Sequence, residues 1–411
     1  EASVRAFVTL NLDGARLAAD ASTARYKAGR PLSRVDGLPV GIKDIFETED
    51  MPTERGSAFH AGDRTGRDAA HVYALRRGGA VIVGKTVTTE FAMARPGPTR
   101  NPFDETRTPG GSSSGTAAGV AAGMFLAGTG SHARGSVIRP ASYCGNYAIK
   151  PTFGAINRGG CTDVFKSQDH IGVHAGGLRD MWMVARFLSE KAGPDPGHPG
   201  LYGPAELTQS SKPRRVAALK TRGWDLTDGA SRQAFETFLE ALERAGVAVL
   251  READEPRLAE YERLLRDATR VWSKISTYEL RWPMQVYRDK DPSLLAPWIV
   301  AAVERGETMT LEDYRTALLE RDQLRRLHEA LHHEIDCYVT LSSPGPAPEG
   351  MDVGDAVFNE PSSLLGCPAL NAPLLAVDGL PLGVQIMGFA HHDARVCAYA
   401  AWMAEAILGA D

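Results

Sequence analysis

The chain has 411 residues, and its composition excludes several classes of protein. Hydrophobic residues make up 43% and charged residues 24%, which is ordinary for a globular protein with a large buried core. The formal net charge of -5 disfavours a polyanion, so we do not expect nucleic acid to be the main partner.

The five cysteines are scattered, and no two of them form a C-x-x-C pair. This spacing suggests neither a disulfide framework nor a zinc knuckle, so buried free thiols in a reducing compartment are expected. The most apolar run, 119–128, is too short to span a bilayer, and residues 1–14 lack the segments of a signal peptide. We therefore expect a cytoplasmic protein without a membrane partner.

The first part of the chain alternates predicted helices with short apolar strands. Alanines and charges predict a helix over 15–26, and 37–46 reads as a short buried strand. A second helix is expected over 68–77, followed by a strand over 80–83 and a turn over 84–86. The strand over 37–46 is unusual because it carries a lysine.

That lysine, Lys43, is followed directly by Asp44. Burial disfavours the charged form of a lysine, so Lys43 must find partners or lose its proton. One interpretation is structural: Lys43 interacts with Asp44 or with the backbone and holds a turn. The other is chemical, because a buried lysine with a lowered pKa can act as a base.

Residues 79–86 satisfy the letters of the phosphate-binding motif G-x-x-x-x-G-K-[ST]. The motif requires its four middle residues to form a loop that presents N–H groups to phosphate. Here those residues are Ala-Val-Ile-Val, which favour a strand and would use their N–H groups in a sheet. We therefore do not predict a nucleotide site.

The stretch 109–152 holds two serines in glycine-rich settings, Ser112 and Ser136. A Gly/Ser loop leads into a predicted small-residue helix over 116–124, whose first N–H groups point at the serine loop. Residues 111–115 also spell G-x-S-x-G, the nucleophile elbow of α/β-hydrolases. An elbow must follow an apolar strand, and 101–109 is polar and bounded by prolines, so we reject that interpretation.

The middle of the chain, about 205–335, is charged, helical and free of motifs, and we interpret it as scaffold and substrate cover. Adjacent histidines at 332–333 and 391–392 point to different sides of any regular element, so no metal site is predicted. Helices are expected over 231–245, 258–280 and 311–334, and strands over 247–250 and 335–341.

The closing part of the chain predicts one strand and one helix. A small-residue segment over 361–372 precedes a turn into a buried strand over 379–386, and a helix ends the chain over 393–408. We expect this last strand to pair near the first strands, which favours a single domain over 1–411.

These residues resemble those of the amidase signature family, and in style the chain is most similar to small bacterial amidases of the malonamidase and allophanate hydrolase type. The resemblance implies an α/β fold with a central mixed β-sheet flanked by α-helices on both faces, and a core signature region at about 37–180. The motifs that carry it lie at residues 37–44, 109–115, 135–141, 144–145, 150–152 and 379–385.

The resemblance also implies a Ser-cisSer-Lys triad. Carried over by motif, Ser136 is the nucleophile, Ser112 is the bridging serine and Lys43 is the base, and neither a metal nor a cofactor is required. A serine hydroxyl is a poor nucleophile until a base takes its proton, and a lysine of lowered pKa can do so through a second hydroxyl. Ser112 and Ser136 lie 24 residues apart, a spacing like that of the family.

Family members bind the tetrahedral oxyanion with backbone N–H groups that lead into the nucleophile, here those of Ala133, Arg134, Gly135 and Ser136. The family usually reads Thr-Gly-Gly-Ser at this turn, whereas this chain reads Ala-Arg-Gly-Ser. If glycine is needed at position 134 for a positive φ or a close approach, Arg134 would strain or crowd the turn.

Three side chains near the nucleophile are predicted to bind substrate: Ser113, Arg134 and Arg139. In relatives with the same Gly-Ser-Val-Ile-Arg-Pro string, the arginine equivalent to Arg139 binds the substrate's carboxylate, which suits a bidentate guanidinium. The alternative is that Arg139 pairs with an acidic residue and holds the loop.

The resemblance implies an amidohydrolase that cleaves a linear C–N bond in a small polar or carboxylate-bearing amide or ureido compound. Two alternatives stay open. One is an amidotransferase A-type subunit that makes ammonia from glutamine for a partner protein. The other is a family member impaired by Arg134. The oligomeric state is open as well, and a homodimer is one possibility.

Overall fold

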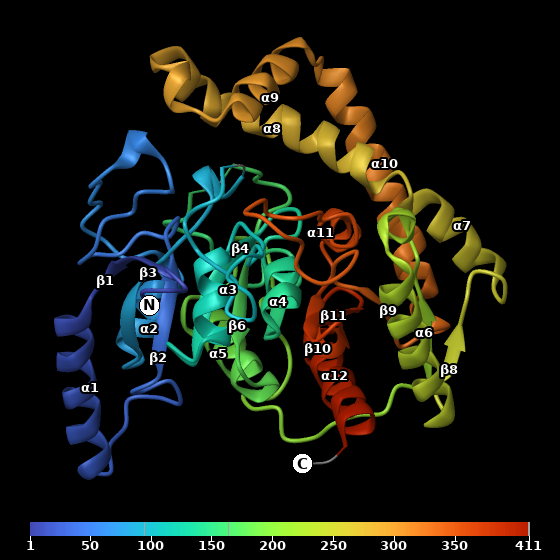
Figure 1. Ribbon diagram of the computed structural model, residues 1–411, viewed down its shortest axis with the longest axis horizontal. Coiled ribbons are helices and arrows are strands. Elements are labelled where there is room, and N and C mark those ends of the chain that lie inside the picture. Colours follow the sequence, from blue (N-terminus) through green and yellow to red (C-terminus); the bar gives the residue numbers. More distant parts are fainter. Residues whose placement is uncertain (94, 163, 410–411) are drawn as a thin grey trace.

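In the computed structural model, which describes residues 1–93, 95–162 and 164–409, the strands form one 11-stranded mixed sheet. The strand order is β1-β3-β2-β4-β6-β5-β10-β11-β9-β7-β8 (Figure 1). The strands are β1 (Phe7–Leu10), β2 (Pro39–Lys43), β3 (Val81–Thr86), β4 (Ala127–His132), β5 (Tyr147–Lys150), β6 (His170–Ala175), β7 (Arg215–Ala218), β8 (Ala248–Leu250), β9 (Cys337–Leu341), β10 (Ala369–Val377) and β11 (Leu380–Met387).

The α-helices are distributed along the whole of the described chain. They are α1 (Leu12–Lys27), α2 (Ala70–Arg77), α3 (Ser114–Ala121), α4 (Ile138–Cys144), α5 (Leu178–Lys191), α6 (Gly229–Arg244), α7 (Pro256–Leu265), α8 (Ala268–Lys290), α9 (Pro297–Thr308), α10 (Leu311–Ala330), α11 (Glu360–Leu365) and α12 (Asp393–Leu408).

Alternate residues of the central strands belong to two separate hydrophobic clusters. In β5, Ile149 packs in the cluster formed with α2, α5, α6 and α12, whereas Ala148 packs in the cluster formed with α4 and α7 to α11. Successive strand residues point to opposite faces of a sheet, so the two clusters are its two faces. The predicted α/β fold, a mixed sheet with helices on both faces, is confirmed.

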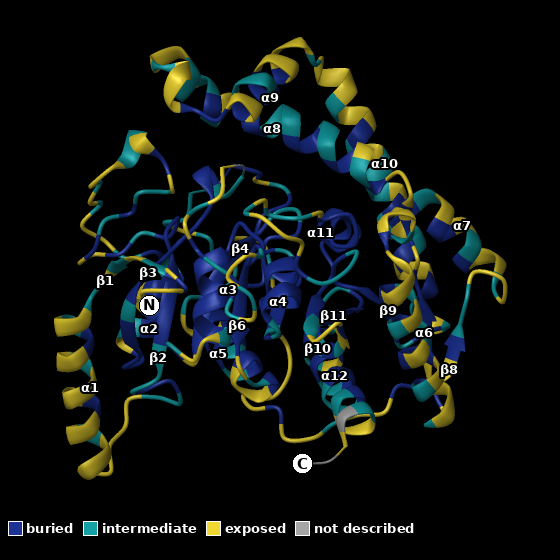
Figure 2. Cartoon of the chain, in the orientation of Figure 1, coloured by how far each residue is buried: buried dark blue, intermediate teal, exposed yellow. Residues whose placement is uncertain are grey.

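Helices α8, α9 and α10 form a cover beyond one end of the sheet (Figure 1). Figure 2 shows that these helices are buried along one side only, whereas α3 and α4 are buried nearly throughout. The cover lies within the region predicted to be helical and free of motifs, about 205–335. That 1–411 form a single domain stays a prediction.

Three sequence predictions of local structure are wrong. Strand β3 continues through 84–86, where a turn was expected, because parallel pairing with β2 extends to Thr86. A single helix was expected over 258–280, but the structure has two: α7 ends at Leu265, and α8 begins at Ala268 after a break. The last strand, β11, pairs with β10 and β9 rather than with the first strands.

The lysine of the phosphate-binding letters, Lys85, lies in strand β3 and is fully buried. Its Nζ lies 2.9 Å from the Asp44 carboxylate and donates to the Pro52 carbonyl and the Thr53 hydroxyl. Burial raises the pKa of Asp44 to about 6 and lowers the pKa of Lys85. Asp44 therefore pairs with Lys85 and not with its neighbour Lys43, and no phosphate loop is formed.

We expect Lys85→Met to lower the free energy of unfolding by about 3–5 kcal/mol, because it leaves the Asp44 carboxylate buried without its cation. Urea unfolding at pH 7.5 measures the change. The double variant Lys85→Met with Asp44→Asn should recover part of the loss, since no unpaired charge remains buried. A single variant as stable as the wild type would contradict the pairing.

Candidate active site

Two parallel strands bring the predicted site residues to one edge of the sheet. Strands β2 and β4 are parallel neighbours, with Ile42 opposite Thr129. The carboxyl ends of parallel neighbours meet at the same edge, so Lys43 at the end of β2 lies beside Ser131 near the end of β4. The chain then turns through 133–137 into α4, and this turn carries Ser136.

Lys43 is fully buried and touches two hydroxyl groups. Its Nζ lies 2.6 Å from the Ser112 Oγ and 2.9 Å from the Ser131 Oγ. Burial lowers the pKa of Lys43 to about 7, and the Asp169 carboxylate opposes this change only in part. A lysine in this setting is partly neutral near pH 7 and can accept a proton.

The two predicted catalytic serines come from neighbouring loops. The Gly111–Ser112 peptide bond is cis, as the family resemblance implies, and the side chain of Ser112 is almost fully buried. The Ser113 N–H donates to the Ser136 carbonyl at 3.3 Å, which ties the two loops together. Within the described residues the hydroxyls of Ser112 and Ser136 are not hydrogen bonded to each other, although such contacts often tighten only when substrate binds.

The turn before Ser136 presents free N–H groups. In the described part of the chain, no protein acceptor is bonded to the N–H groups of Arg134, Gly135 and Ser136. The next N–H, that of Val137, donates to Nδ1 of the buried His132 at 3.2 Å. Unpaired backbone donors beside a nucleophile are what an oxyanion site requires.

Arg134 does not strain this turn. It is not among the residues with positive φ, so a side chain is tolerated there. The close approach occurs one residue later, because a Cβ on Gly135 would lie 2.7 Å from the Asn359 Oδ1 and 2.8 Å from the Ala356 Cβ. Glycine is therefore required at 135 rather than at 134.

The Arg134 guanidinium points to the carboxylate of Glu360 in α11. Two of its nitrogens lie 2.5 and 2.6 Å from the Glu360 Oε1, and Glu360 is almost fully buried. The guanidinium also lies 5.2 Å from the ring centroid of Trp272 in α8. The Arg134 side chain remains 42% exposed, so it lies at the surface of the site.

Arg139 lies in α4 with its guanidinium buried beneath the serine loop. It donates to the Gly354 carbonyl at 2.9 Å and to the Gly111 carbonyl at 2.6 Å, whereas its buried Nε has no hydrogen-bond partner among the described residues. Burial lowers the pKa of Arg139, and no acidic residue lies in ion-pair contact with it in the described chain. Arg139 thus supports the loop through two backbone carbonyls.

The third predicted substrate-binding residue, Ser113, is fully buried, and its hydroxyl donates to the Ser131 carbonyl at 3.4 Å. Sequence reasoning missed Ser131, Trp272 and Glu360. Ser131 lies five residues before the nucleophile, and its position near the end of a strand could have indicated it. Trp272 and Glu360 lie in segments without motifs, and only the fold brings them to the site.

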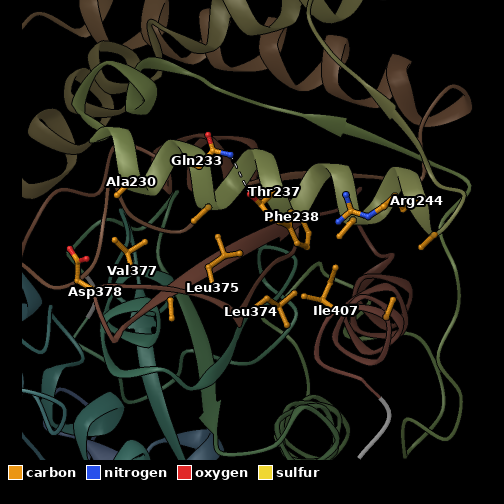
Figure 3. Close-up of a pocket in the computed structure, with 15 residues that line it drawn as sticks. Ala230, Gln233, Thr237, Phe238, Arg244, Leu374, Leu375, Val377, Asp378 and Ile407 are labelled. Atoms are coloured by element: carbon orange, nitrogen blue, oxygen red, sulfur yellow. Dashed lines mark hydrogen bonds between the residues drawn. The ribbon is translucent and has the colours of Figure 1, made fainter.

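A wide groove lies away from these residues. It has a volume of about 960 Å³ and lies between α6, β10 and the end of α12 (Figure 3). Apolar side chains such as Phe238 and Leu374 line it, and none of the predicted catalytic residues does. Because Lys43, Ser112 and Ser136 are not among its lining residues, this groove is separate from the candidate active site.

Residues 1–397 match the family model described as Amidase, and the chain therefore belongs to the amidase family. This membership makes it an enzyme of the amide-cleaving class. No helix in the described residues is long and apolar enough to cross a membrane, and their His, Cys, Asp and Glu side chains form no cluster suited to a metal ion.

Curated and solved relatives span nearly the whole chain. The A subunit of the glutamyl-tRNA(Gln) amidotransferase from Chloroflexus aggregans is 31% identical, over 94% of this chain and 86% of that protein. A solved structure described as an amidase is 27% identical in sequence and has a TM-score of 0.85. The match covers 99% of this chain and 93% of the chain in that structure. The solved structure of the peptide amidase from Stenotrophomonas maltophilia is 26% identical and has a TM-score of 0.78. That match covers 99% of this chain and 90% of the peptide amidase chain.

Proposed function

We propose that the protein hydrolyses a linear C–N amide bond in a small polar or carboxylate-bearing amide or ureido compound, through an acyl-enzyme on Ser136. The observation that carries the proposal is the buried Lys43 amine, 2.6 Å from the Ser112 hydroxyl, at the edge of the sheet where the Ser136 turn begins. Neither a metal nor a cofactor enters the proposed mechanism.

In the first half of the reaction, the Ser136 Oγ attacks the amide carbonyl carbon. Its proton passes to the Ser112 hydroxyl, while Ser112 gives its own proton to the neutral Lys43 amine. The negative charge on the carbonyl oxygen is stabilised by the N–H groups of the turn from Ala133 to Ser136. The C–N bond then breaks, and Lys43 returns the proton through Ser112 to the leaving nitrogen.

In the second half of the reaction, water attacks the acyl-enzyme. The water proton moves through Ser112 to Lys43, and the same N–H groups stabilise the second tetrahedral intermediate. Breakage of the ester bond releases the acid, and the proton returns to the Ser136 Oγ. Ammonia or an amine, together with a carboxylic or carbamic acid, are the products.

The carboxylate preference rests on Arg139, whose Nε–H is buried without a partner close to the serine loop. We expect malonamate and succinamate to be cleaved about 10- to 100-fold faster, in kcat/KM, than propionamide and butyramide, because a charged hydrogen bond contributes about 1.5–3 kcal/mol. Ammonia release from purified protein measures this. Arg139→Lys should lower the ratio of kcat/KM on the charged amides to kcat/KM on the neutral amides. Equal rates on charged and neutral amides in the wild type would contradict carboxylate binding by Arg139.

A second candidate is a glutaminase subunit that supplies ammonia to a partner. The curated relative from Chloroflexus aggregans, named as an amidotransferase A subunit and similar over 94% of this chain, favours it. Glutaminase activity that appears only with a co-purifying partner would support this candidate. Activity of the isolated chain on small amides would support the hydrolase.

Catalytic impairment by Arg134 is less well supported than activity. The free N–H groups of the turn and the absence of a positive φ at Arg134 favour a working oxyanion site. We also retain a cytoplasmic location and a small-molecule partner as parts of this proposal, since the scattered cysteines and the net charge suit both.

A further inference from the structure

Three successive carbonyls of the turn that leads into Ser136 accept hydrogen bonds, two of them from side chains of distant segments and one from the first turn of helix α4. The Trp272 Nε1 donates to the Ala133 carbonyl at 2.8 Å. The Ser363 hydroxyl lies 3.4 Å from the Arg134 carbonyl, and the Arg139 N–H donates to the Gly135 carbonyl at 3.0 Å. The turn is thus held at three successive peptide groups.

These carbonyl contacts decide where the N–H groups of the turn point. A peptide group is planar and trans, so its carbonyl and its N–H point in opposite directions. A donor bound to the Ala133 carbonyl therefore orients the N–H of Arg134, and a donor bound to the Arg134 carbonyl orients the N–H of Gly135. These two N–H groups are among the free donors of the proposed oxyanion site.

The bond from Trp272 is the stronger of the two side-chain contacts. The Ser363 hydroxyl has a single proton and also lies 3.3 Å from the Asn359 carbonyl, so its bond to the turn is shared. The Trp272 indole has one donor and one acceptor at 2.8 Å, and its ring is almost fully buried against Phe165. Loss of the indole N–H would leave the Ala133 carbonyl without this partner.

The same tryptophan also holds the side chain that departs from the family pattern. The Arg134 guanidinium lies over the Trp272 ring and pairs with Glu360, whose carboxylate accepts a further bond from Thr269 in α8. Helix α8 therefore contacts both the backbone of the turn, at the Ala133 carbonyl, and the side chain of Arg134. The arginine binds the turn to the cover helix rather than disrupting it.

We propose that Trp272 is a positioning residue for the oxyanion site: by binding the Ala133 carbonyl and carrying Arg134, it directs the Arg134 N–H at the substrate carbonyl. The inference rests on the proposed function of Ser136. It gives helix α8 of the cover a part in transition-state stabilisation in addition to covering the site.

The test is the second-order rate of labelling of Ser136 by a fluorophosphonate, whose P=O oxygen needs the oxyanion donors as it reacts. Loss of one such donor costs on the order of 10²–10³ in rate, so a donor that is present but less well oriented should cost about 10-fold or more. We expect this loss for Trp272→Phe, which keeps an aromatic ring but removes the N–H.

The pH dependence separates positioning from general damage. Because Lys43 is untouched, the midpoint of the labelling rate against pH should not change in Trp272→Phe, while its plateau falls. The matched control is Trp282→Phe, on the same helix but 71% exposed, which should label like the wild type. Wild-type labelling by Trp272→Phe, or a loss explained by a shifted midpoint, would overturn the inference.

Trp272 is buried, so the phenylalanine variant could fail to fold, and circular dichroism checks this. If the phenylalanine variant does not fold, the labelling rate of a variant with benzothienylalanine at position 272 tests the inference instead. This amino acid keeps the two-ring shape of tryptophan and replaces only the N–H by sulfur. The proposed function has its own readout: Ser136→Ala must abolish labelling. If Ser136→Ala still labels, the proposed function fails; if only Trp272 is without effect, the positioning role fails alone.

Discussion

Replacing Ser136 by alanine is expected to abolish amide hydrolysis, with kcat/KM falling by about 10⁴- to 10⁶-fold. No acyl-enzyme can form without the hydroxyl, and the remaining donors of the turn can only assist attack by water. Lys43 and Ser112 would still hold their hydrogen bond, because Ser136 takes no part in it. The variant should therefore fold normally while losing its chemistry.

Ammonia release from the best substrate of the amide panel measures the loss, and mass spectrometry after fluorophosphonate treatment shows whether the adduct disappears. Ser210→Ala is a suitable control, because the Ser210 hydroxyl bonds only Glu405 in the described chain and lies at the surface. Turnover within 10-fold of the wild type in Ser136→Ala would refute the assignment of the nucleophile.

The part of the site that could be predicted from sequence is the part with an unusual residue in a regular pattern. Lys43 interrupts an apolar strand, and Ser112 and Ser136 stand in glycine-rich turns, so the chemistry of each is visible locally. The structure explains why Lys43 reaches the serines: strands β2 and β4 are parallel, so their carboxyl ends lie at the same edge of the sheet. Strand β4 itself was missed, because its residues, Ala-Gly-Thr-Gly-Ser-His, show no apolar alternation.

The contacts that hold the oxyanion turn could not be predicted. Arg134 and Glu360 are separated by 226 positions, and Trp272 lies 139 positions from the carbonyl that it binds. Such pairs depend on how the cover helices pack on the sheet, and nothing local in the sequence specifies that packing. For the same reason, the sequence could not show whether position 134 needs glycine; in the structure Arg134 has no positive φ, and its side chain pairs with the buried Glu360.

Lys43→Ala is expected to lower kcat/KM by about 10³- to 10⁵-fold, because the two serines would then lack a base. Unlike the loss of Ser136, this loss should be partly reversed by added small primary amines, which can occupy the vacated space. Lys85→Ala is not a suitable control, since Lys85 is needed to pair with Asp44. Lys212→Ala is a suitable control instead, because Lys212 is exposed in the loop between α5 and β7.

The pH profile of the wild type should identify Lys43 as the base. Burial lowers its pKa to about 7, and the reaction requires the neutral amine, so kcat/KM should rise with pH and level off about one unit above 7. Asp44, whose pKa burial raises to about 6, is the competing candidate for that midpoint. Warming distinguishes the two, because the pKa of an amine falls with temperature and that of a carboxyl hardly changes. A midpoint that stays fixed on warming would assign the titration to a carboxyl group and remove Lys43 from the role of base.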